Sequence, residues 1–74
     1  MKFLVRLGAV IQDRRVQRGL SQQELGDCAG LHRTYISDVE RGRRNMTVLV
    51  LTRIADCLDV RVEKLLRSAE QPDR

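Results

Sequence analysis

The stretch 21–40 restricts the fold of this chain more than any other part of it. Ser21 is a good N-terminal cap for a helix, and Glu24 three residues later completes the pattern called a capping box. Apolar residues follow at helical spacing, until Gly30 offers the left-handed conformation in which many helices end. The pattern therefore predicts a short helix at 22–29 that stops in a sharp turn.

A second short helix is predicted from about residue 32 to residue 40. Ile36 and Val39 are spaced to face inward, whereas polar side chains occupy the opposite edge. A short helix with one apolar and one polar edge can pack by the first and contact another molecule by the second. Two helices joined by a tight glycine turn have the geometry of a helix-turn-helix, whose second helix lies in the major groove of DNA.

The rest of the chain predicts three further helices and no second domain. Helical periodicity covers 3–18, 48–58 and the residues from Val62 onward, which makes the chain all-α with five helices. A chain of 74 residues has room for one small core. We expect a single domain at 1–67 and a disordered tail at 68–74.

Positive charge is concentrated in the first part of the chain. Residues 1–45 hold nine Lys and Arg against five Asp and Glu, a difference of +4, whereas residues 46–74 hold five of each. This asymmetry favours a polyanion partner, with a merely basic surface as the alternative. Proteins that bind single-stranded nucleic acid stack the bases on aromatic rings. This chain has only one Phe and one Tyr, which argues against that class of protein.

One collinear pattern between Leu7 and Leu66 includes Arg15, Gly19-Leu20-Ser21-Gln22, Glu24-Leu25, Gly30-Leu31, Tyr35-Ile36-Ser37, Glu40-Arg41-Gly42, Ile54-Ala55 and Leu58. This pattern resembles the helix-turn-helix domain of the Cro/C1-type (XRE) repressor family. The string from His32 to Ser37, together with Glu40-Arg41-Gly42 and Arg44-Asn45, is similar to small controller proteins of restriction–modification systems. The resemblance implies a five-helix lambda-repressor-like fold with its helix-turn-helix at about 22–40. It also implies a transcriptional regulator that binds a near-palindromic double-stranded DNA operator as a homodimer.

The outward edge of the second helix holds the candidates for reading bases, which are Arg33, Thr34, Ser37 and Asp38. Arg33 can donate two hydrogen bonds to guanine, and the methyl group of Thr34 can touch thymine. Asp38 can accept from cytosine or orient Arg33.

Candidates for contact with the DNA backbone flank this edge, and they are Gln22, His32, Tyr35, Arg43, Arg44 and Asn45. Gln22 opens the first helix of the motif, where free backbone N–H groups favour a phosphate. His32 is either a plain helix cap or a phosphate donor, and Tyr35 is either a core residue or a phosphate donor. The arginines of the loop 41–45 are the main expected phosphate clamps, unless this loop is simply solvated.

Two further sets of residues have structural roles. The resemblance implies an ion pair between Arg15 and Glu40, which ties the first helix to the end of the recognition helix. Val48 is expected on the core face of its helix, whereas Leu49 and Val50 fall outside that face. With Leu66, these two residues are the predicted dimer interface, and scattered surface apolar residues are the alternative.

Other classes of function have little support in the sequence. Cys28 and Cys57 lie among apolar residues and are expected to be buried and reduced, with a disulfide or redox switch as the alternative. Two Cys and one His in no ligand spacing predict no metal or cofactor. No nucleophile pairs with a base, so we expect no enzyme.

No run approaches the about 20 apolar residues that cross a membrane. We therefore expect a cytoplasmic protein that does not enter membranes, without a small-molecule ligand because no sensing domain follows Leu66. An antitoxin-type or other protein-interaction module, or a small phage-type repressor, is the alternative function.

Overall fold

A computed structural model describes residues 2–70 of the chain. Within this range the chain forms five helices, α1 (Lys2–Gln17), α2 (Gln22–Ala29), α3 (Arg33–Glu40), α4 (Val48–Cys57) and α5 (Val62–Glu70). The described residues include no β-strand, so the predicted all-α class is confirmed. None of these helices is both long and apolar enough to cross a membrane.

The helix caps that the sequence predicted are present in the structure. The Ser21 hydroxyl accepts a hydrogen bond from the backbone N–H of Glu24, whose carboxylate accepts one from the N–H of Ser21 in return. Gly30 ends α2 in the left-handed conformation with a φ of 71°. Thr47 caps α4 with its hydroxyl.

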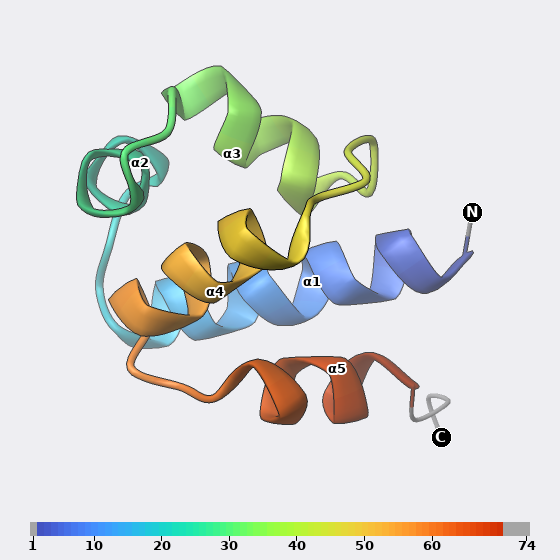
Figure 1. Ribbon diagram of the computed structural model, residues 1–74. Helices are drawn as coiled ribbons and strands as arrows, with labels where there is room; N and C mark the ends of the chain where they lie inside the picture. Colours follow the sequence, from blue (N-terminus) through green and yellow to red (C-terminus); the bar gives the residue numbers. More distant parts are fainter. Residues whose placement is uncertain (1, 71–74) are drawn as a thin grey trace.

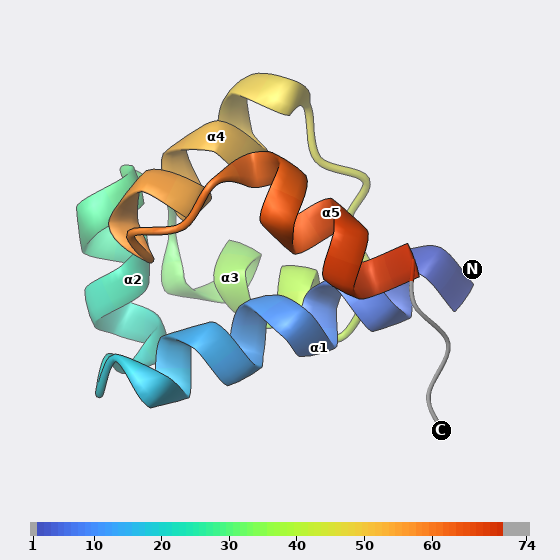
Figure 2. The ribbon, with the colours of Figure 1, turned by 90° about the horizontal axis from the view of Figure 1, so that it is seen from below.

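The helices form a small bundle around one core. Figure 1 shows α3 on one side of α1 and α4 and α5 on the opposite side, whereas the view from below separates α1 and α4 to opposite edges, with α3 and α5 between them (Figure 2). Each helix contributes at least one large side chain that is fully buried, and these are Ile11, Leu25, Ile36, Val39, Ile54 and Leu65. The shared core therefore places α3 on an outer face, where its far edge is free.

A glycine allows α1 to approach the carboxyl end of α3. A Cβ atom at Gly8 would collide with the backbone carbonyl of Val39 and would lie 2.7 Å from that of Glu40. Gly8 is buried at this crossing. The close approach brings the middle of α1 to the residues that end the recognition helix.

Two expectations about the second half of the chain are wrong. Val48 is 77% exposed instead of facing the core, because α4 begins at this residue and its first turn extends beyond the core. The helical domain also continues past residue 67, since α5 runs to Glu70 and the side chain of Ala69 is fully buried. The remainder of the predicted tail, 71–74, lies outside the described residues.

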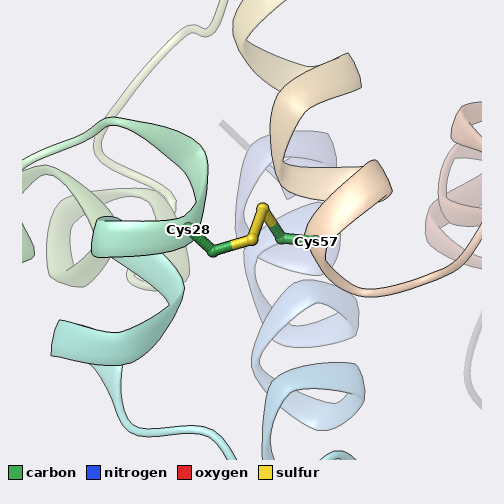
Figure 3. Close-up of a disulfide and its surroundings, with 2 residues drawn as sticks. All are labelled: Cys28 and Cys57. Atoms are coloured by element: carbon green, nitrogen blue, oxygen red, sulfur yellow. A yellow bond between two sulfur atoms is a disulfide. The ribbon is translucent and has the colours of Figure 1, made fainter.

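The expectation of buried, reduced cysteines is also wrong. Cys28 is exposed and forms a disulfide with the half-buried Cys57, which joins the last turn of α2 to the last turn of α4 (Figure 3). The two Cα atoms are 6.0 Å apart, within the usual range for a disulfide. The pairing depends on how α2 packs against α4, and helical spacing alone does not contain that information.

Candidate nucleic-acid interface

The recognition helix α3 is anchored by one edge and exposed at the other. Ile36 and Val39 are buried in the core, whereas Arg33 and Thr34 are exposed at its N-terminal end. Ser37 and Asp38 are half-buried. The structure thus brings the four predicted base-reading residues together on α3, two of them exposed and two half-buried.

Asp38 is engaged by the loop that follows the helix. Its carboxylate lies 3.8 Å from Nε of Arg44, and its backbone carbonyl accepts a hydrogen bond of 2.9 Å from the N–H of Arg43. The sequence suggested that Asp38 orients Arg33, but the structure pairs it with Arg44 instead. The chain direction reverses after Glu40, and this reversal brings the loop back beside Asp38.

Besides its contact with Asp38, the side chain of Arg44 lies over the ring of Tyr35. Its guanidinium carbon lies 4.7 Å from the centre of the Tyr35 ring, a distance at which a cation–π interaction is favourable. Tyr35 is half-buried and packs against the core. Arg44 is therefore positioned by Tyr35 and Asp38, while the neighbouring side chains of Arg43 and Asn45 are exposed.

His32 is the N-terminal cap of α3. Its Nδ1 atom accepts a hydrogen bond of 3.1 Å from the backbone N–H of Thr34. This confirms the cap role that the sequence offered as one of two possibilities. Because Nδ1 is an acceptor, the neutral ring carries its hydrogen on Nε2, which remains a donor on an exposed side chain.

A buried ion pair holds the other end of α3. Arg15 donates to Glu40 through Nε at 2.6 Å and through a terminal nitrogen at 3.1 Å, so the pair implied by the family resemblance is present. The side chains are 11% and 2% exposed. The hydrogen bond to Glu40 raises the pKa of the Arg15 guanidinium above its ordinary value, although burial acts in the opposite direction.

Gln22 belongs to the same buried network. Its side-chain Nε2 donates a hydrogen bond of 3.0 Å to the carboxylate of Glu40. The guanidinium of Arg15 also donates a hydrogen bond of 2.7 Å to the backbone carbonyl of Leu20. The sequence predicted a phosphate contact for Gln22 and missed this internal partner. No spacing rule indicates it, because 18 residues separate Gln22 from Glu40.

The predicted dimer residues divide into two kinds. Leu49 is 64% exposed, as expected for a residue outside the core face, and it is next to Val48, whose exposure was not expected. Val50 and Leu66 are half-buried and pack against the core. Leu66 also lines an apolar pocket of about 200 Å³, whose other lining residues come from α1, from the end of the arginine loop and from α4. Among the predicted dimer residues, only Leu49 in the first turn of α4 is therefore an exposed apolar side chain.

Comparison with known proteins identifies helix-turn-helix proteins as the relatives of this chain. A family model described as "Helix-turn-helix" (HTH_3) matches residues 11–65. Control protein C.SmaI of Serratia marcescens is 45% identical over 56 residues, which are 76% of this chain and 67% of that protein.

Two solved structures have a similar fold. The restriction-modification controller protein C.AhdI of Aeromonas hydrophila has a TM-score of 0.82 at 37% identity, over 84% of this chain and 94% of its own. SinR, a master regulator for biofilm formation, was solved in complex with DNA. It has a TM-score of 0.77 at 34% identity, over 81% of this chain and 97% of its own.

Proposed function

This chain belongs to the helix-turn-helix family HTH_3, and we propose that it is a transcriptional regulator that binds double-stranded DNA in a sequence-specific manner. The observation that carries the proposal is the exposed edge of α3, which presents Arg33 and Thr34 at one end of the helix, with the basic loop 41–45 directly after the other end. A rigid helix with polar side chains on its free edge can read base edges, and flanking arginines can bind phosphates.

The roles of the individual residues follow from their positions. Arg33, Thr34, Ser37 and Asp38 contact bases, whereas Gln22, His32, Tyr35, Arg43, Arg44 and Asn45 contact the sugar–phosphate backbone. The Tyr35 ring and Asp38 hold Arg44 in place, so this arginine loses little conformational freedom when a phosphate binds. The side-chain amide of Gln22 is bound to Glu40, so its contribution comes from the N-terminus of α2.

The regulator acts as a homodimer on a near-palindromic operator. The exposed Leu49 on α4 supports an interface on that helix and on α5, which includes Val50 and Leu66. A two-fold axis through this interface places the two recognition helices in major grooves about one helical turn, ~34 Å, apart.

The biological setting is a restriction–modification system, in which the chain acts as a controller protein. The names of C.SmaI and C.AhdI support this setting. The protein works in the cytoplasm, where its DNA is, and is a regulator without enzymatic activity. An antitoxin role has no support in the relatives described above.

Selection of bound duplexes from a random DNA pool, at two salt concentrations, tests the proposal. A symmetric motif that survives at the higher salt is the expected result, because base contacts are less salt-sensitive than phosphate contacts. The Arg33→Ala variant, taken through the same selection, should lose preference at one position in each half of the motif. Binding that selects no sequence and disappears at the higher salt would contradict the proposal.

A further inference from the structure

The disulfide encloses most of the residues that we assign to DNA, with Gln22 as the exception. Cys28 and Cys57 are 29 residues apart in the sequence, and the segment between them contains all of α3 and the arginine loop 41–45. Figure 3 shows the bond crossing directly from α2 to the end of α4. The recognition helix is therefore part of a covalently closed loop, whereas α1 and α5 are outside it.

We propose that Cys28 and Cys57 are a redox-reversible pair that controls the stability of the recognition helix. When the disulfide is formed, the ends of the segment that contains α3 stay joined even if α3 separates from the bundle. When it is reduced, α2 and α4 are held together only by packing. Opening of α3 then becomes more frequent, and the residence time on DNA becomes shorter.

The position of the bond in the bundle explains why its effect should be local. α2 packs against α3 on one side and against α4 on another, so it is the helix through which α3 is attached to α4. Crosslinking two points reduces the freedom of the chain between them in the open state, and this raises the free energy of opening for that segment. α5 packs mainly against α1 and lies outside the loop.

The surroundings of the sulfurs indicate the class of reductant. Cys28 is exposed and accessible to attack, whereas Cys57 is half-buried. A dithiol is the suitable reductant, because its second thiol completes the exchange intramolecularly once the sulfur of the exposed Cys28 has been attacked.

The reaction is an ordinary thiol–disulfide exchange. A thiolate of the dithiol attacks Sγ of Cys28 and forms a mixed disulfide, and Cys57 leaves as a thiolate that takes up a proton. The second thiol of the reductant attacks its own sulfur in the mixed disulfide, and Cys28 leaves and is protonated. Two electrons and two protons pass to the protein, and the reductant becomes a cyclic disulfide. Oxidation by a disulfide of the same class reverses each step.

Amide hydrogen exchange of the full chain, oxidised and then reduced with dithiothreitol, tests the proposal without DNA. We expect reduction to lower the protection of α3 amides such as that of Ile36 by about tenfold to a few hundredfold, the range that closing a loop of this length allows. Protection of Leu65 in α5 should change several times less. The Cys28→Ser/Cys57→Ser double variant should resemble the reduced chain and should not respond to dithiothreitol.

The proposal would be overturned if the protection of α3 amides changed less than twofold on reduction. It would also be overturned if α5 amides lost as much protection as α3 amides, or if the double variant responded to dithiothreitol. The effect on DNA residence rests on the proposed function and is measured separately, as the dissociation rate from a selected duplex. If no duplex is selected, the proposed function fails while the hydrogen-exchange test remains valid.

Discussion

Removal of the Glu40 carboxylate should destabilise the fold strongly. In Glu40→Ala, the guanidinium of Arg15 loses both of its hydrogen bonds to the carboxylate and keeps only the carbonyl of Leu20 as a partner, on a side chain that is 11% exposed in the native protein. Gln22 loses its acceptor as well. Breaking a buried ion pair from one side costs about 3–5 kcal/mol, because one charge remains buried without a counter-charge. This cost is a large fraction of the free energy of unfolding of a whole domain, which is about 5–15 kcal/mol.

Urea denaturation and thermal unfolding, both followed by circular dichroism with the disulfide kept oxidised, measure this loss. For a domain of this size 1 kcal/mol corresponds to about 4–8 °C, so a loss of ~3 kcal/mol lowers the Tm by roughly 12–24 °C. The matched control is Arg61→Ala, which removes a pair of 3.4 Å with Glu63 on the surface. Exposed pairs contribute about 0–1 kcal/mol, so the control should change little.

A double-mutant cycle separates the ion pair from the loss of packing. Arg15→Met removes the charge and keeps most of the volume, and combined with Glu40→Ala it leaves no buried charge at the site. We expect the double variant to lose clearly less stability than the sum of the two single variants, with a coupling of about 1–3 kcal/mol. Additive losses, or a Glu40→Ala loss as small as that of Arg61→Ala, would refute the reasoning.

Three further variants test the proposed DNA contacts and the dimer. Arg33→Ala should cost about 1–3 kcal/mol of binding and relax preference at one base position, and an unchanged selected motif would reject its role as a reader. Arg43→Ala should weaken binding to all sequences alike and reduce the salt slope by about one, so a sequence-dependent loss in titrations would contradict a phosphate contact. Leu49→Glu should give monomers in sedimentation, since it places a charge in the proposed interface; a dimer of unchanged affinity would locate the interface elsewhere.

Much of the fold could be predicted because its signals are local. Ser21 with Glu24, and Gly30, indicate where α2 begins and ends through bonds within a few residues of each other. Ile36 and Val39 indicate the buried edge of α3 by their spacing alone. Caps and helical spacing depend on residues a few positions apart, so both can be predicted from the sequence.

Features that depend on contacts between distant segments could not be predicted in the same way. The disulfide requires the packing of α2 on α4, and the pairing of Arg44 with Tyr35 and Asp38 requires the return of the loop after Glu40. The Arg15–Glu40 pair is equally non-local, and only the resemblance to a known family suggested it. The error at Val48 has a different cause, since periodicity does not show how far the core extends along a helix.

The placement of Glu40 suggests that the buried pair orients α3 as well as stabilising it. A negative charge at the carboxyl end of a helix is opposed by the helix dipole, so this glutamate is not favoured by its own helix. It is favoured only where Arg15 meets it, and α1 can meet it closely because residue 8 is a glycine.

Arg33 lies seven residues before this anchor, or ~10 Å along the helix axis. A tilt of about 10° around the anchored end would move Arg33 by roughly 2 Å, enough to disrupt a bidentate contact with guanine. A folded Glu40→Gln variant should therefore lose discrimination between DNA sequences more than it loses affinity for non-specific DNA. Competition titrations with selected and random duplexes measure both, and equal losses would show that the pair contributes stability alone.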